Sequence, residues 1–388
     1  MKQGWEIKKL GEVCSFQRGL TYSKDDEVES SNNCVLRSNN IDLDTMSIVL
    51  DELKYINEDI AVSEDKKVKP NTILICMSNG SKQHIGKVAF IDRNYGYAFG
   101  GFMGLITPKD SVSPKYIYYS CLTSAYKHFL AGIGNGANIT NLKFSDLSQF
   151  TLPIPPIAEQ ERIVAELNCL SGVIEKKKQQ LKELDALAES IFYTMFGDPI
   201  TNEKGWEVKR LGEVCKFSQG IQVDLPLQST EKKTGWNKFL RIVDYTTNNS
   251  DIRYVNINNE KYYVKFDDVV VVRYGASAGV VGIKQEGILA NNLFKLNHSK
   301  DKLNYIYLYC LLSTNYYKTF VKETAFGAAM PALNFNSFKI FNIIIPPLSL
   351  QQEFASKIEA IEKQKELIKE SIKETETLFN ARMQYYFG

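Results

Sequence analysis

The sequence lacks the features that mark membrane proteins, secreted proteins and zinc enzymes. No stretch approaches the ~20 consecutive apolar residues that cross a membrane, and the N-terminal residues carry charge without the apolar segment of a signal peptide. His84, His128 and His298 lie far apart, without the spacing of zinc ligands. The seven cysteines include no CxxC pair, and their odd number argues against a disulfide framework. We therefore expect a cytoplasmic protein with reduced thiols and no membrane partner.

Recognised catalytic motifs are also missing. The segment GSKQHIGK resembles a phosphate-binding loop, but five residues rather than four separate Gly80 from Gly86, and Val88 replaces the Ser or Thr that would bind magnesium. Neither double proline has the flanking polar and aromatic residues of the amino-methyltransferase tetrapeptide, and no Gly-x-Ser-x-Gly nucleophile elbow or convincing Asp…Glu-x-Lys nuclease cluster is present. We expect this chain to hold no catalytic residue, metal or cofactor.

The most informative feature that is present is an internal repeat. GWEIKKLGEVCSFQRG begins at Gly4, and GWEVKRLGEVCKFSQG begins at Gly205, an offset of 201 residues. LPIPPIAEQERI and IIIPPLSLQQEF, each with a double proline, are offset by 191 residues, and each half ends in Phe-Gly. A repeat of this length indicates a duplicated domain with a spacer, because solenoid units repeat every ~20–50 residues.

The repeat divides the chain into two globular segments and two helices. We predict heads at 1–152 and 198–343, a central helical segment at 153–197 and a C-terminal one at 344–388. Short β-branched runs and aromatic-rich helical stretches predict a mixed α/β fold for each head. Residues 1–150 carry 17 basic and 17 acidic side chains, whereas 198–345 carry 19 and 14. Net charge alone therefore indicates a polyanion partner only for the second head.

Heptad patterns predict that both helical segments are coiled-coil helices. Apolar residues alternate at spacings of four and three over about five heptads. The first seam comprises Ile163, Leu167, Leu170, Ile174, Leu181, Leu184 and Ile191, and the second comprises Phe354, Ile358, Ile361, Ile368, Ile372 and Phe379. Lys177 interrupts the first seam, and Lys365, Thr375 and Arg382 interrupt the second. A helix over 158–196 has a length of about 58 Å at ~1.5 Å per residue.

Two apolar seams of equal length in one chain are expected to bury each other. An antiparallel pairing would place the two heads at opposite ends of the helices and give the chain a pseudo-twofold repeat. The alternative is that each seam pairs with a helix of another chain. Cys14 and Cys215, which are equivalent in the repeat, are expected to pack in the cores of the heads as small apolar residues.

Polar side chains on three sets of turns are the candidate binding residues of the heads. One set follows an apolar strand and comprises Ser78, Asn79, Lys82 and Gln83 in the first head and Arg273, Tyr274 and Ser277 in the second. The other sets comprise Arg37, Asn39, Asn40 and Arg241, and Asn135 and Asn138. Asn and Gln can pair with adenine edges and Arg or Lys with guanine edges. Flanking glycines, such as Gly86 and Gly279, would let the backbone approach a ligand. The alternative is an ordinary turn composition.

The chain resembles, over its full length, the specificity subunit of type I restriction–modification enzymes. The doubled GW…LGEVC, the doubled proline pair with a following glutamine before each long helix, and the Phe-Gly helix ends carry the resemblance. It is further supported by the paired boxes around Leu142 and Leu333, although Pro331 and Asn334 of the second box are out of step with the first.

This resemblance implies two target-recognition domains, each reading one half of a bipartite double-stranded DNA target. The helices would set the separation of the half-sites and dock two methyltransferase subunits. The resemblance also implies that these partners use S-adenosylmethionine, and that restriction subunits use ATP and Mg²⁺. Two alternatives remain: a two-headed coiled-coil interaction protein that does not bind DNA, and a self-contained restriction enzyme.

Overall fold

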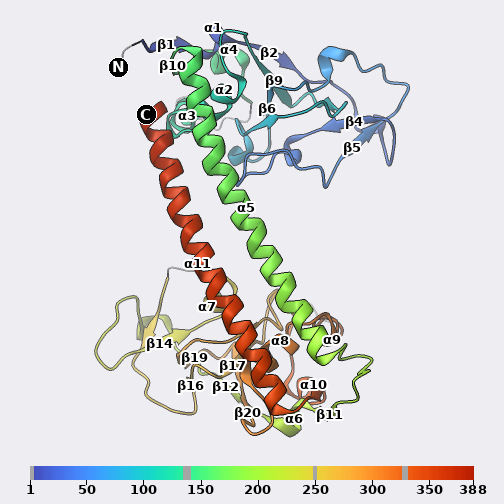
Figure 1. The fold of residues 1–388 in the computed structure, drawn as a ribbon, viewed down its shortest axis with the longest axis vertical. Coiled ribbons are helices and arrows are strands. Elements are labelled where there is room, and N and C mark those ends of the chain that lie inside the picture. Colours follow the sequence, from blue (N-terminus) through green and yellow to red (C-terminus); the bar gives the residue numbers. More distant parts are fainter. Residues whose placement is uncertain (1–3, 134–140, 248–250, 326–330) are drawn as a thin grey trace. The chain divides into compact units, whose positions relative to one another are not determined.

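The computed structural model describes residues 4–133, 141–247, 251–325 and 331–388, and the chain divides into two compact units (Figure 1). The first unit comprises Met1–Lys177 and Ser371–Gly388, and the second comprises Lys178–Glu370. Each unit therefore combines one head with a part of both long helices. The sequence predicted four successive segments, because boundaries read along a chain do not show which distant segments pack together.

The first head contains three sheets and short helices. Its sheets are β1-β10 (Glu6–Lys9, Thr151–Ile154), β2-β9-β6-β7 (Cys14–Arg18, Met103–Pro108, Thr72–Cys76, Val88–Ile91) and β3-β5-β4-β8 (Glu27–Val28, Lys54–Ile56, Asn33–Leu36, Ala98–Phe99). The helices are α1 (Leu10–Val13), α2 (Pro114–Ser120), α3 (Ser124–Gly132) and α4 (Phe144–Leu147), and the 3₁₀ turns are η1 (Lys24–Asp26), η2 (Ser38–Asn40), η3 (Glu64–Lys66) and η4 (Lys82–His84). The predicted mixed α/β fold is confirmed.

The second head has the corresponding elements. Its sheets are β11-β21 (Glu207–Arg210, Asn342–Ile345), β12-β20-β17-β18 (Cys215–Gln219, Leu293–His298, Val269–Val272, Val281–Gly282) and β13-β15-β14-β19-β16 (Gln228–Ser229, Tyr254–Val255, Asn237–Leu240, Gly287–Leu289, Tyr263–Val264). The helices are α6 (Leu211–Val214), α7 (Val243–Thr246), α8 (Tyr305–Leu311), α9 (Asn315–Ala325) and α10 (Phe335–Lys339), and η5 spans Leu225–Leu227.

The two heads pair their strands in the same order. The order β2-β9-β6-β7 of the first head corresponds to β12-β20-β17-β18 of the second, with antiparallel pairing throughout. In both heads one parallel pair, β4-β8 or β14-β19, lies inside the other sheet. The inner strands β6 and β17 are buried along their whole length, as their run of apolar and β-branched residues requires. The sequence repeat is therefore a repeat of topology.

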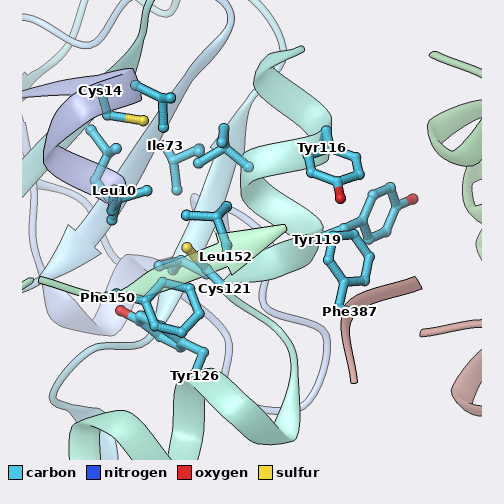
Figure 2. Packing of buried hydrophobic residues seen from close by; sticks show 14 of the residues in the cluster. Leu10, Cys14, Ile73, Tyr116, Tyr119, Cys121, Tyr126, Phe150, Leu152 and Phe387 are labelled. Atoms are coloured by element: carbon cyan, nitrogen blue, oxygen red, sulfur yellow. The ribbon is translucent and has the colours of Figure 1, made fainter. Parts of the chain in front are cut away.

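The core of the first head lies between its sheets and α2, α3 and the helix ends. Figure 2 shows Cys14, Leu10 and Ile73 together in this core, and Phe387 beside Tyr119. Cys14 and its equivalent Cys215 are both buried, as predicted, and burial raises the pKa of the Cys215 thiol to about 12. A thiol with such a pKa stays protonated near neutral pH, so a packing role fits it better than chemistry.

The predicted long helices are α5 (Ile157–Phe196) and α11 (Leu348–Phe387), of 40 residues each. All thirteen predicted seam side chains are buried or half-buried. In the first unit the start of α5 contacts the end of α11, where the Glu166 carboxylate accepts a hydrogen bond of 2.7 Å from the Tyr386 hydroxyl. In the second unit the end of α5 contacts the start of α11, where Phe192 packs on Phe354. In each unit, therefore, the start of one long helix lies against the end of the other.

The two Phe-Gly helix ends anchor the helices in equivalent places. The ring of Phe387 lies 4.9 Å from that of Tyr116 in the first unit, and the ring of Phe196 lies 4.7 Å from that of Tyr307 in the second. Tyr116 and Tyr307 occupy the same position of α2 and α8. Within the described parts of the chain, no helix is both long enough and apolar enough to cross a membrane.

Candidate nucleic-acid interface

A hollow of about 1080 Å³ opens in the first head where β2, β4 and β6 end. Residues from five separate stretches of the chain line it, including the turn before β9. Arg18, Lys24 and Arg37 give its wall positive charge, and Glu27 is the one carboxylate among the described residues that line it. The hollow combines cations, amides and hydroxyls at strand ends, a composition suited to an anionic, hydrogen-bonding ligand such as DNA.

Four of the predicted turn residues meet in this hollow: Arg37, Asn39, Ser78 and Asn79. The Asn79 side chain is held in place, since its Nδ2 donates to Ser38 Oγ at 2.8 Å and its Oδ1 accepts from the Ser81 backbone at 2.8 Å. The two predicted turn sets, about 40 residues apart in the sequence, therefore form one surface.

The charge of Arg37 is partly balanced within the hollow. Its Nη1 lies 3.8 Å from Glu27 Oε1, and Lys54 lies closer to the same carboxylate, at 2.9 Å. The hydrogen bond from Lys54 lowers the pKa of Glu27, which therefore remains charged near neutral pH. The Arg37 Nε is buried without a hydrogen-bond partner in the protein. Arg37 therefore retains donors that are not used inside the protein.

The prediction that Asn40 contacts a ligand is wrong. Its side chain is only 1% exposed, because it closes the turn after β4. Its Oδ1 accepts from the Arg37 backbone at 2.8 Å, and its Nδ2 donates to the Val49 and Glu52 carbonyls at 3.0 and 3.2 Å. All of its polar atoms serve the fold.

The other predicted residues of the first head lie elsewhere. Lys82 and Gln83 are exposed in η4 and do not line the hollow. Asn135 and Asn138 lie outside the described residues. The lysine of the phosphate-loop-like segment, Lys87, is buried, and its ammonium donates to the Ile41 carbonyl at 2.6 Å. That contact supports the rejection of a nucleotide site there.

Gly86 and Gly279 do not serve the approach of a ligand, contrary to the prediction. Both have φ near +80° to +90°, where a residue with a side chain is strained. A Cβ at Gly86 would lie 2.3 Å from the Leu130 side chain, and a Cβ at Gly279 would lie 2.4 Å from the Val321 side chain. Gly86 allows the turn after β6 to pack against α3, and Gly279 allows the turn after β17 to pack against α9. By contrast, a Cβ at Gly80, which lines the hollow, would meet no atom within 4 Å.

In the second head, Arg241 corresponds to Arg37 but is more fully paired. Its Nη1 lies 3.2 Å from Asp251 Oδ2, its Nη2 donates to the Asp251 carbonyl, and its Nε lies 3.6 Å from Asp244 Oδ2. These contacts hold the guanidinium against its own head. The Nε of Arg241, like that of Arg37, is buried without a hydrogen-bond partner, but both Nη groups of Arg241 are paired, so it has fewer donors left for a base.

The remaining candidates of the second head surround the end of β17. The Arg273 guanidinium lies over the Tyr274 ring at 4.7 Å and over the Phe335 ring at 5.1 Å. The Arg273 Nε is buried and has no hydrogen-bond partner in the protein. Ser277 is half-buried, and its carbonyl accepts from Val280 at 3.0 Å in the following turn. Stacked arginines of this kind keep a planar face and edge donors in one orientation.

The sequence did not point to several residues that line the hollow, among them Arg18, Tyr22, Lys24 and Phe102. Phe102 stands out because its side chain is 74% exposed. An alignment of the two repeats places Asn292 opposite Phe102. This difference between the heads is the signal in the sequence that could have identified Phe102. The backbone carbonyls of Phe102 and Asn292 each accept a hydrogen bond of 2.9 Å from the residue that directly follows the inner strand, Met77 or Arg273.

The hollow and the described residues around it contain no cluster of three or more His, Cys, Asp or Glu side chains that could hold a metal ion. The hollow offers cations, hydroxyls and amides that can form hydrogen bonds with a ligand.

Comparison with protein families gives one match that spans both heads. The family described as "Type I restriction modification DNA specificity domain" matches residues 2–186 and again residues 203–377. The two matched stretches correspond to the two copies of the repeat.

Similar proteins of known name match almost the whole chain. The StySPI specificity subunit of a type I restriction enzyme from Salmonella potsdam is 23% identical, over 99% of this chain and 88% of its own length. The EcoKI specificity subunit from Escherichia coli K12 is 24% identical, over 93% and 82%. Among solved structures, the S subunit of a type I system from M. genitalium aligns over 99% of this chain and 96% of its own, with a TM-score of 0.63 and 14% identity. A second, from a study of complex assembly in a type I system, has a TM-score of 0.56 and 18% identity over 99% and 97%.

Proposed function

The chain belongs to the family of type I restriction modification DNA specificity domains, and from that premise we propose that it is the sequence-recognition subunit of a type I restriction–modification complex. Each head reads one half of a bipartite double-stranded DNA target. The observation that carries this is the repeated topology with different side chains at the strand ends. A shared frame with divergent turn residues suits two readers of different sequences.

The long helices, in this proposal, form an antiparallel coiled-coil spacer that relates the heads by a pseudo-twofold repeat. The contacts of Glu166 with Tyr386, and of Phe192 with Phe354, support antiparallel pairing in each unit. Helices of 40 residues have a length of about 60 Å at ~1.5 Å per residue. That is long enough to set apart two major-groove contacts one turn of DNA, about 34–36 Å, from each other.

The catalytic steps belong to partner subunits. Two methyltransferase subunits dock on the helices and bring S-adenosylmethionine, and restriction subunits bring ATP and Mg²⁺. This chain contributes no catalytic residue or cofactor of its own. The absence of recognised catalytic motifs from the sequence supports this division. The free cysteines of the described residues fit a protein that works in the reducing cytoplasm.

Single-molecule sequencing of host DNA methylation tests the function. We expect a bipartite motif with two half-sites of about 3–5 bp separated by about 5–8 unread base pairs, since heads one DNA turn apart leave the middle unread. Deletion of the gene should remove that methylation. One continuous motif, or methylation unaffected by the deletion, would contradict the proposal. A non-DNA interaction protein would not copurify with a methyltransferase, and a self-contained restriction enzyme would cut DNA alone with Mg²⁺.

A further inference from the structure

Phe102 has an environment that ordinary exposed aromatic residues lack. A single exposed apolar side chain is common on protein surfaces and needs no explanation. Phe102, however, is 74% exposed on the wall of the cation-lined hollow of the first head. The ring is therefore presented at the place where the head is proposed to meet DNA.

The backbone of Phe102 is rigidly held. Its carbonyl oxygen accepts hydrogen bonds from the backbone N–H groups of both Met77, at 2.9 Å, and Ser78, at 3.1 Å. The turn closes when the Met103 N–H donates to the Gly100 carbonyl at 2.8 Å. Only the two side-chain torsions of the phenylalanine remain to be ordered when the ring meets a ligand, so the entropy cost of using it is small.

The frame of the head does not need an aromatic ring here. The second head keeps the same backbone contact, from Arg273 to the carbonyl of Asn292, but has a half-buried asparagine in place of Phe102. The ring is therefore a property of the first head alone. Because the two heads share a topology but differ at this position, Phe102 and Asn292 are suited to select different half-sites.

The cations beside Phe102 suit the phosphates that would flank an inserted ring. Arg18 and Lys24 are exposed on the same wall, and Arg37 lies deeper in it. Apolar side chains that enter between base pairs unstack them and kink the duplex, and nearby Arg and Lys groups hold the backbone in place. Pyrimidine–purine steps unstack at the lowest cost.

On the basis of the proposed function, we propose that Phe102 is a wedge that inserts its ring at one base step of the half-site read by the first head. That half-site is then selected partly by the ease of unstacking at that step, which favours a pyrimidine–purine step. The second half-site, read by the head that has Asn292, is selected without such a wedge.

The test uses the full chain in complex with its methyltransferase subunits. Duplexes carry the bipartite sequence obtained from methylation mapping, with 2-aminopurine placed at each adenine position in turn, because its fluorescence rises when it unstacks. We expect the wild-type complex to give one signal in the first half-site that Phe102→Ala abolishes and Phe102→Trp retains. The affinity of Phe102→Ala should fall roughly 5- to 150-fold, the range for losing one aromatic–base stack.

Two controls separate the outcomes. Phe266→Ala removes a half-exposed aromatic ring of the second head and should change neither fluorescence nor affinity in the first half-site. A signal from a base flipped by the methyltransferase subunits should persist in Phe102→Ala. Equal fluorescence and affinity of the Phe102→Ala and wild-type complexes would overturn the wedge and leave the proposed function standing. A wild-type complex that recognises no bipartite target would overturn both.

Discussion

The side-chain amide of Gln160 donates a hydrogen bond to the carbonyl oxygen of Pro155 across 2.8 Å. The amide oxygen of the same side chain accepts from the backbone N–H of Ser113, also at 2.8 Å, where α2 begins. Gln160 is buried, so both bonds form away from water. The residue thereby ties the double-proline entry of α5 to the head that precedes it.

Gln351 repeats this arrangement in the second head. Its Nε2 donates to the Pro346 carbonyl at 2.8 Å, and its Oε1 accepts from the Asn304 N–H at 2.9 Å. The doubled proline–glutamine motif of the sequence thus has a structural cause, which is the fixed joint between each head and the helix that follows it.

Replacing Gln160 with Met should lower the free energy of unfolding by about 2–6 kcal/mol. The volume is nearly kept, but the Ser113 N–H and the Pro155 carbonyl lose their partner in a buried place, at about 1–3 kcal/mol each. Denaturant unfolding and amide hydrogen exchange of α2 measure the effect. Gln179→Met, at an exposed position of the same helix, is the matched control and should change little. Equal stability of the two variants would show that the joint does not depend on this amide.

Arg37→Gln should relax the choice of base at one position of the first half-site. Arg37 lies in the hollow and retains unused donors, and a good bidentate arginine–base contact gives about 1–3 kcal/mol of discrimination. Methylation mapping of the variant complex measures this directly. Lys82→Gln, which removes an exposed charge outside the hollow, should leave the motif unchanged. An unaltered motif in Arg37→Gln would exclude base reading by this residue.

Deleting one heptad from α5, residues 179–185, together with the equivalent residues 370–376 of α11, should change the spacing and not the half-sites. Seven helical residues correspond to about 10 Å, or roughly 3 bp of DNA. Sequencing of the methylated motif should show a shorter spacer, or no methylation if assembly fails. Alanine substitutions at the exposed Lys182 and Glu183 keep the length and should keep the spacer. Changed half-site bases would refute the division between helices and heads.

The second unit should lose stability as the pH falls below about 6.5, in part through His298. Burial is the main cause that lowers the pKa of this imidazole from its ordinary value of 6.5. Between pH 6.5 and the lower pKa of the folded state, His298 is protonated in the unfolded chain but neutral in the folded protein. Stability therefore falls with pH through this interval. Urea midpoints between pH 5 and 8 measure the slope. The slope should be shallower in His298→Gln, and an identical slope would exclude His298 as its source.

Lys177 and Lys365, two of the four interruptions of the seams, have structural explanations. The Lys177 ammonium donates to the Ser371 hydroxyl and lies 3.4 Å from Thr375 Oγ1 in the first unit. The Lys365 ammonium lies 2.6 Å from an Asp185 oxygen in the second unit. Each lysine thus meets a polar partner on the facing helix. A polar pair within an apolar seam fixes the register of the two helices, and it lowers the stability of the helix pair. The apolar residues of the seams could be predicted from the sequence. The polar partners of the two lysines could not, because they lie on the facing helix, whose register the sequence does not give.

The sequence by itself determined the repeat, the helix boundaries and the seam positions. Heptad spacing, double prolines and terminal glycines act within a few residues, so their effects can be read along the chain. The predicted helix 158–196 accordingly differs from α5 by one residue.

Only the tertiary structure decided which turn residues face a ligand. Asn40 and Gly86 were predicted for the binding surface, yet both serve internal packing, whereas Phe102 was not predicted and is the most exposed ring of the hollow. All three lie in connections between strands. Their roles differ because exposure depends on segments distant in the sequence, such as α3 for Gly86 and the end of β6 for Phe102, which meet only when the sheets assemble.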